Sequence, residues 1–272
     1  MKTVCPDGKL GEEDRFTNPH PGDHSMLRAA MTCLVTCVLS LASLQNAEIQ
    51  ILEFDRDFSL PIEKIINCGA GVFFLTSPNA PAGRGYSNET LRNILSDCSG
   101  LLVVDEAYAD FADTNAVELL AEYPNLFITR TFSKSYGLAG LRVGYAIGHA
   151  DTLERMRTVA RFGSVTVLSA AAALVSLRDS DRIEWEILEN HKVREFTLSA
   201  FREMGCRVTD SQTNFIWVDV KRSPEVFREA CFALDVLVGR DFPSPSNTYA
   251  RISLGTMEEM QKAIAVFKKV LS

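Results

Sequence analysis

The sequence predicts an α/β fold: a mainly parallel sheet flanked by helices, followed by a smaller α+β unit. The main observation is three apolar runs, each of which ends in polar or turn-forming residues: Phe73–Leu75, Leu101–Val104 and Leu126–Ile128. Uninterrupted apolar runs of this length are typical of strands buried on both faces, as in parallel sheets. Because such strands deliver their polar residues at the carboxyl edge, we expect a functional site there.

Further strands and helices are predicted around these runs. Alternating polarity indicates a strand at Glu48–Phe54, and Arg142–Gly148 reads as another. Helical spacing occurs at Asn88–Cys98 and Asn115–Tyr123, each with Asn or Ser available as a cap. A long helical pattern at Asp151–Leu177, broken around Gly163-Ser164, is predicted to bridge two domains.

The C-terminal part predicts helices around two strands, with the helices near Trp185–Met204, Pro224–Leu234 and Met257–Leu271. We therefore divide the chain into an atypical N-terminal segment (1–42), a partial large domain (43–158) and a small C-terminal domain (159–272).

Composition narrows the class of protein. At 272 residues and 46% hydrophobic content, the chain can form a substantial core. Its seven cysteines are an odd number without a Cys-x-x-Cys pair, which argues against a disulfide framework or zinc site and for a reducing, cytoplasmic location. Four scattered histidines argue against a catalytic metal. A net charge of −7 disfavours nucleic acid as a partner.

The N-terminal segment has two contrasting parts. Met1–His24 is polar and is typical of a loose arm or disordered tail, whereas Ala29–Leu44 contains no charged residue. A membrane span needs about 20 strongly apolar residues. Because this run is shorter and diluted by Thr, Ser and Cys, a buried helix is favoured, and an exposed apolar face there could promote association.

The segment after the third apolar run contains the strongest chemical signal. Lys134 lies between the hydroxyl residues Ser133 and Ser135, and Arg142 follows eight positions after the lysine. Hydroxyls and a guanidinium make an anion site beside the amine. This combination suits a lysine that bonds covalently to an aldehyde carried by a phosphorylated cofactor.

Two upstream motifs accompany this lysine. Asp105 ends the second apolar run, where its carboxylate can pair with a protonated ring nitrogen, and Tyr108 follows three residues later. The first run ends in the turn Ser77–Gly83, which contains Asn79. Three strand-then-turn units in this order place their polar residues at one sheet edge.

Together with Val238–Phe242 and Arg251–Met260, these motifs resemble those of the class I/II aminotransferases of fold type I, which use pyridoxal phosphate (PLP). Within them, the chain is most similar to the histidinol-phosphate aminotransferase branch, from about Leu44 to Ser272. The resemblance implies a homodimer with PLP sites at the subunit interface, an amino donor and a 2-oxo acid acceptor as substrates, and no membrane partner.

The resemblance also implies roles around the cofactor. Lys134 would be the Schiff-base lysine and the acid and base that moves a proton at the substrate Cα. Asp105 would hold the pyridine nitrogen protonated, and Tyr108 would hydrogen-bond the ring hydroxyl. The candidates for gripping the phosphate are Ser133, Arg142 and Thr131.

Three further residues are substrate-binding candidates. Arg251 would pair bidentately with the substrate carboxylate, and Arg240 would bind a substrate phosphate. Asn214 could line the substrate pocket. Structural readings stay open for all three: an ion pair for either arginine, and a turn cap for the asparagine.

The chain also departs from the family pattern. Ala80 stands where many relatives have an asparagine that contacts the cofactor ring hydroxyl, and Asn79 is expected to substitute for it. Before Leu44 we identify neither the phosphate-binding glycine loop nor the aromatic residue that stacks on the pyridine ring.

Three hypotheses follow. The first is a PLP-dependent aminotransferase acting on histidinol phosphate and 2-oxoglutarate, with an aromatic amino acid or related amine as the alternative donor. The second is a decarboxylase of a phosphorylated amino acid, which shares the same motifs. The third is a catalytically impaired or truncated aminotransferase-fold protein that binds cofactor weakly.

Overall fold

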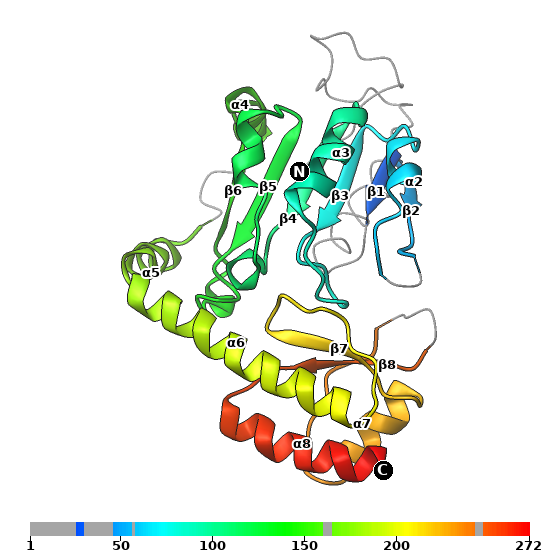
Figure 1. Cartoon of the computed structure of the whole chain (residues 1–272). Coiled ribbons are helices and arrows are strands. Elements are labelled where there is room, and N and C mark those ends of the chain that lie inside the picture. Colours follow the sequence, from blue (N-terminus) through cyan, green and yellow to red (C-terminus); the bar gives the residue numbers. More distant parts are fainter. Residues whose placement is uncertain (1–25, 30–45, 56–57, 160–164, 243–246) are drawn as a thin grey trace.

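The computed structural model describes residues 26–29, 46–55, 58–159, 165–242 and 247–272. Its larger part is a six-stranded sheet in the order β2-β1-β3-β4-β5-β6 (Figure 1). The strands are β1 (Met26–Ala29), β2 (Glu48–Ile51), β3 (Val72–Thr76), β4 (Leu101–Asp105), β5 (Leu126–Thr131) and β6 (Gly144–Gly148). All neighbours are parallel except β6, which runs antiparallel to β5. The predicted mainly parallel sheet is confirmed.

The central strands bring three chain segments to one edge. Every residue of β3 is buried, as are the first four of β4, as expected for strands covered on both faces. Asp105 is the register partner of Thr76 on β3 and of Thr129 on β5. Because the register aligns these strand ends, the loops after β3, β4 and β5 all leave the sheet at the same edge.

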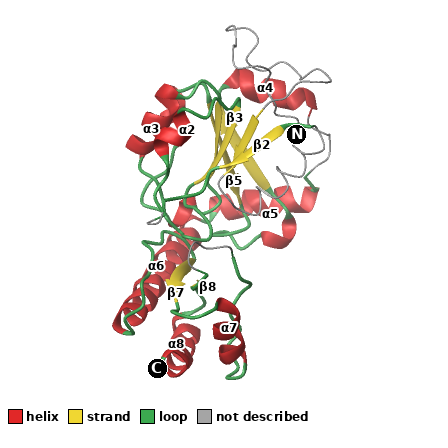
Figure 2. Cartoon of the chain, turned by 90° about the vertical axis from the view of Figure 1, so that its right-hand side faces the viewer, coloured by secondary structure: helices red, strands yellow, loops and turns green. Residues whose placement is uncertain are grey.

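Helices cover both faces of this sheet (Figure 2). On one face, α2 (Ile62–Ile66) and α3 (Asn88–Asp97) contribute buried side chains to a core that includes Leu102 and Val104. On the other face, Leu153 and Met156 of α4 (Ala150–Val159) pack against the core formed by alternate strand residues. The two faces therefore use the period-two alternation of the strands.

Helix α3 confirms the prediction at Asn88–Cys98, and the Ser87 hydroxyl caps it by accepting from the Thr90 N–H at 3.2 Å. The helix predicted at Asn115–Tyr123 is wrong: the segment forms only a short 3-10 helix, η2 (Val117–Ala121). Pro124 follows directly and disfavours helical geometry at the preceding residue, so the chain ends the turn and enters β5.

The predicted pattern at Asp151–Leu177 forms two helices, α4 and α5 (Val167–Arg178). The predicted break at Gly163-Ser164 lies outside the described residues. A third helix, α6 (Ser180–Glu203), begins after α5 and runs from the large sheet to the second unit (Figure 1). The connection between the units is therefore made by α6 rather than by the Asp151–Leu177 pattern.

The second unit is built on the antiparallel pair β7 (Phe215–Asp219) and β8 (Tyr249–Ser253). Helices α6, α7 (Pro224–Phe232) and α8 (Met257–Leu271) enclose one core with these strands. Phe201, Phe227 and Phe267 meet there with ring centroids 5.4 and 5.5 Å apart. The helices predicted in this region are confirmed, while the domain boundaries at 42 and 158 stay predictions.

The turn after β3 joins the two units. The Thr209 hydroxyl donates to the Ala82 carbonyl at 2.5 Å, and the Gln212 N–H donates to the Gly83 carbonyl at 2.8 Å. Gly83 has φ +76°, and a Cβ there would collide with the Ser211 hydroxyl. Glycine is therefore needed at position 83 for two reasons: its backbone conformation has positive φ, and the second unit approaches it too closely for a Cβ atom.

One strand was not predicted. Residues 26–29 form β1, which pairs with both β2 and β3, within the segment set apart as 1–42. The predicted polar arm (1–24) lies outside the described residues, as does the apolar segment 29–44 apart from Ala29. Within the described part of the chain, no helix has the length and apolarity that a membrane span requires.

Candidate active site

Asp105 is the acidic residue at the centre of the carboxyl edge. Its Oδ1 accepts from the Ala107 N–H at 3.1 Å and from the Thr129 hydroxyl at 3.5 Å. Burial raises the pKa of this carboxyl to about 6, while those hydrogen bonds and the charge of Lys134 oppose the rise. Above that pH it is a carboxylate prepared to hold a cationic partner.

Lys134 lies in the turn after β5, on the neighbouring strand, and its charge acts on Asp105. The Lys134 Nζ is 4.9 Å from the centroid of the buried Tyr108 ring, a distance typical of cation–π contact. The structure therefore brings three sequence-predicted residues from two loops into one cluster.

The loop that carries Lys134 is held on both sides of the lysine. The Thr131 hydroxyl donates to the Ser133 hydroxyl at 2.8 Å and accepts from the Ser133 N–H at 3.1 Å. The Ser135 hydroxyl donates to the Asp110 carboxylate, which lies in the loop after β4. These contacts tie the lysine turn to β5 and to the segment that follows Asp105.

The phosphate-binding candidates occupy the same turn. Arg142 is exposed, adopts a left-handed conformation (φ 49°) at the end of η3 (Ala139–Leu141), and donates to the Ala139 carbonyl at 2.9 Å. Ser133 and Thr131 are half-buried. These side chains are donors of the kind that bind phosphate, and phosphate binding by the three residues stays a prediction.

The turn after β3 contains Ala80, where the chain departs from the family pattern, and Asn79, which is expected to substitute for the asparagine of the relatives. Asn79 is fully buried, and its Oδ1 accepts from the Ala82 N–H at 3.1 Å. Its Nδ2 has no hydrogen-bond partner in the described part of the chain. Ala80, instead, packs in a cluster with Tyr108 and Phe215. Position 80 therefore lies against the tyrosine of the site, while cofactor contact by Asn79 stays a prediction.

Aromatic rings connect this cluster to the substrate-binding candidates of the second unit. The Tyr108 and Phe215 rings meet edge to face at 5.2 Å. The Arg251 guanidinium lies 4.1 Å from the centroid of Phe215 and 5.3 Å from that of Phe242. Two rings therefore link Lys134 to Arg251, which places the arginine of β8 beside the carboxyl edge of the large sheet.

The other two substrate-binding candidates are less closely tied to this cluster. Arg240 is exposed and stacks 4.7 Å from the centroid of Phe242. Asn214 lies directly before β7, and its carbonyl accepts from the Leu254 N–H at 3.0 Å. This contact involves only the backbone, so the role of the Asn214 side chain, as a turn cap or toward substrate, stays a prediction.

Two buried charged groups near the site were missed by sequence reasoning. Glu106, which follows Asp105, forms an ion pair with Arg130 at 2.7 Å. Arg194 of α6 donates to the Phe111 carbonyl at 3.3 Å and the Thr213 carbonyl at 3.4 Å, thereby joining the two units. A charged residue inside a strand such as Leu126–Thr131 is the one signal that could have pointed to the first pair.

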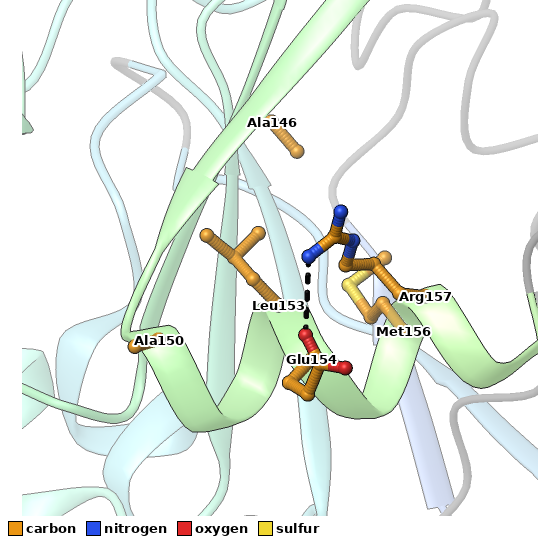
Figure 3. A pocket seen from close by; sticks show the side chains of 6 residues that line it. All are labelled: Ala146, Ala150, Leu153, Glu154, Met156 and Arg157. Carbon is orange, nitrogen blue, oxygen red and sulfur yellow. Dashed lines mark hydrogen bonds and ion pairs between the residues drawn. The ribbon is translucent and has the colours of Figure 1, made fainter.

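A separate pocket of about 560 Å³ lies between β6 and α4 (Figure 3). It is lined by Ala146, Ala150, Leu153, Glu154, Met156 and Arg157. None of these is a predicted site residue, and the Glu154–Arg157 ion pair is an exposed contact within one helix. We therefore place the candidate site at the carboxyl edge. Among the described residues, no group of His, Cys, Asp and Glu could hold a metal ion.

The side chains at the carboxyl edge fit PLP by their chemistry. They offer an amine for an aldehyde, a carboxylate for a protonated ring nitrogen, a phenol, and hydroxyls with a guanidinium for a phosphate. The carboxylate ends β4 and the amine lies in the turn after the neighbouring parallel strand β5, so one small ligand can reach both.

Comparison with known proteins agrees with this chemistry. The family model "Aminotransferase class I and II" matches residues 41–267. The curated histidinol-phosphate aminotransferase of Syntrophotalea carbinolica is 34% identical over 233 residues, covering 85% of this chain and 67% of that protein. The chain thus spans about two thirds of the length of the curated relatives it matches.

Solved structures share the fold. The structure of a putative histidinol-phosphate aminotransferase from Erwinia carotovora atroseptica has a TM-score of 0.82 at 24% identity, covering 90% of this chain and 74% of that chain. The histidinol-phosphate aminotransferase of Sinorhizobium meliloti, solved in complex with pyridoxal-5'-phosphate, has a TM-score of 0.80 at 23% identity. That alignment covers 91% of this chain and 70% of the other.

Proposed function

Because the chain belongs to the class I and II aminotransferases, a family that uses PLP, we propose that it transfers an amino group between histidinol phosphate and 2-oxoglutarate. The observation that carries the proposal is the convergence of Asp105, Tyr108 and Lys134 at one sheet edge, with Arg251 beside them. The curated relatives named histidinol-phosphate aminotransferases support the substrate, and with it a role in histidine biosynthesis.

When bound, PLP supplies an aldehyde and an electron-accepting ring. Asp105, with its pKa of about 6, is a carboxylate at neutral pH and holds the proton on the ring nitrogen. The Lys134 amine would hold the aldehyde and would move the proton at the substrate Cα.

The remaining residues bind and orient. The Tyr108 hydroxyl donates to the ring hydroxyl, and Ser133, Thr131 and Arg142 bind the cofactor phosphate. Arg251 binds the substrate carboxylate, because its guanidinium offers two parallel N–H donors that match a carboxylate. Its contacts with the Phe215 and Phe242 rings support this role, since both rings restrict where the guanidinium can lie. Arg240 binds the substrate phosphate.

The test is an assay of the purified chain with PLP, histidinol phosphate and 2-oxoglutarate, read as glutamate formed. Turnover that exceeds the rate with an aromatic amino donor supports the proposal. Release of carbon dioxide from a phosphorylated amino acid, without glutamate, would favour the decarboxylase instead. Weak PLP binding without turnover of any donor would favour the impaired protein.

We also infer that the chain forms a homodimer through α5. This helix is apolar around its circumference, and large side chains on it are exposed: Val167, Leu168, Leu174, Val175 and Leu177. Val167 is 85% and Leu168 78% exposed, so a second copy would remove much apolar surface from water. Sedimentation should give a dimer that Leu168→Glu dissociates; a wild-type monomer would contradict the inference.

The free thiols of the described cysteines support a cytoplasmic location.

A further inference from the structure

Glu106 is a buried carboxylate whose hydrogen bonds are all made within the protein. Its side chain is 3% exposed. Its Oε2 accepts from the Arg130 Nε at 2.9 Å and Nη2 at 2.7 Å, and its Oε1 accepts from the Ala116 N–H at 2.5 Å. Burying an ionised carboxylate costs free energy unless hydrogen-bond donors compensate for the lost water. Two N–H donors of Arg130 and the Ala116 N–H do so here, and together they fix the position of the Glu106 carboxylate.

The ion pair joins the two strands that carry the site. Glu106 is the residue after Asp105, and its own N–H donates to the Thr129 carbonyl of β5 at 2.9 Å. Arg130 is on β5, four residues before Lys134. Because side chains alternate along a strand, Glu106 and Arg130 lie on the sheet face opposite to Asp105. Their side chains therefore do not occupy the sheet face on which Asp105 lies, and their ion pair holds the ends of β4 and β5 together from the opposite face.

Charges around the pair also reach the site. The negative charge of Glu106 opposes ionisation of Asp105, and the positive charge of Lys134 favours it. Burial raises the pKa of Glu106, which Arg130 and the Ala116 N–H counteract and which the Asp110 carboxylate reinforces. Tyr145 of β6 also hydrogen-bonds Arg130. Loss of Arg130 would leave a buried carboxylate uncompensated next to Asp105.

We propose that Glu106 and Arg130 are positioning residues: their ion pair clamps the end of β4 to β5 and so fixes Asp105 relative to Lys134. This rests on the proposed function, in which those two groups bind one cofactor. Neither residue of the pair touches the cofactor or substrate in this account. The effect on the site passes through the strand ends and through the charge beside Asp105.

The test uses the full chain and two measurements. The first is the midpoint of the Asp105 titration without cofactor, followed by carbon-13 NMR. The second is the dissociation constant of PLP, measured by absorbance. The variants are Arg130→Gln, Arg130→Lys and Glu106→Gln. Glu122→Gln is the control, because it breaks an ion pair with Arg92 in which both side chains are substantially exposed, at 51% and 41%.

Arg130→Gln should raise the Asp105 midpoint and weaken PLP binding about tenfold, a typical loss when a partner that orients a binding group is removed. Arg130→Lys keeps the charge but loses the two-nitrogen contact, so binding should weaken while the midpoint stays near wild type. Glu106→Gln should lower the midpoint, and it also serves if Arg130→Gln does not fold. The control should change neither value.

Folded Arg130→Gln and Glu106→Gln variants with the wild-type midpoint and wild-type PLP affinity would overturn the proposal. The proposed function fails separately, if wild type does not bind PLP at Lys134. Because the midpoint is measured without cofactor, the charge coupling between the pair and Asp105 is then still tested. In that case, the wild-type midpoint in both folded Arg130→Gln and Glu106→Gln variants would overturn the proposal on this measurement alone.

Discussion

The carboxyl edge of the large sheet and the β7–β8 unit contribute to the candidate site in different ways. At the sheet edge, Asp105 and Lys134 are placed by strands whose register is fixed along buried runs. In the second unit, Arg251 is held by stacking between rings, while Arg240 is exposed. In the proposed function, the sheet edge is therefore the half that carries the chemistry, and the second unit is the half that selects the substrate.

The largest effect should come from the sheet edge. Lys134→Ala removes the amine that binds the aldehyde and moves the proton, so the transamination rate should fall on the order of 10³-fold or more. The measurement is single-turnover kinetics with saturating donor. Lys192→Ala is the control, because that lysine is 62% exposed and pairs with Glu189 on the same helix. Equal rates for both variants would remove Lys134 from the mechanism.

The Asp105→Asn variant tests how much the buried carboxylate at the same edge lowers the free energy of unfolding. The carboxyl pKa is raised from 3.8 to about 6 on folding, so the folded state holds its proton more tightly than the unfolded state. Its ionisation therefore lowers stability as pH rises from about 4 to 6, by about 3 kcal/mol in all.

The Asp105→Asn variant should accordingly be more stable than wild type at pH 8 and about equal to it near pH 3.5. Urea unfolding at the two pH values measures the difference, and its activity should fall because the ring nitrogen loses its anionic partner. A variant that is less stable at pH 8 would mean that the carboxylate stabilises the fold, which contradicts its burial cost.

The second unit should give an intermediate effect at Arg251. Arg251→Lys keeps the positive charge but loses the two parallel donors and the planar stacking on Phe215 and Phe242. The KM for the amino donor should rise about 10-fold to 100-fold with little change in kcat, because carboxylate binding is weakened. A fall in kcat at unchanged KM would instead place Arg251 in the chemical step.

The smallest effect is expected at Arg240. Arg240→Ala removes an exposed guanidinium from the face of Phe242, a contact worth about 0.5–1 kcal/mol at exposed sites. The KM for a donor without a phosphate should change less than about threefold, and the KM for histidinol phosphate should rise more. Equal changes for the two donors would show that Arg240 does not bind the phosphate.

The same contrast explains what could be predicted from the sequence. The apolar runs Leu101–Val104 and Leu126–Ile128 predict their strands because every position of each run is apolar and buried, on both faces of the sheet. The three polar turns then meet by topology alone. Strand β1 was missed because its four residues, Met-Leu-Arg-Ala, carry no periodic pattern, and its place between β2 and β3 depends on distant pairing.

Contacts between side chains far apart in the sequence were also beyond prediction. Glu106 reaches Arg130 and Ala116, and Arg194 bonds to carbonyls of Phe111 and Thr213. Apart from the position of Arg130 inside a strand, nothing local to these residues distinguishes them from surface charges. The 3-10 turn at Val117–Ala121 was misread because Glu106 and Pro124 limit a segment whose spacing alone is helical.

The most direct test of the account is an absorbance titration of the purified chain with PLP, followed by borohydride reduction and peptide mapping. We expect a saturable Schiff-base band and a covalent pyridoxyl group on Lys134 alone. A band that persists in Lys134→Ala, or a label on another lysine, would contradict the central claim that the edge formed by β4 and β5 is the cofactor site.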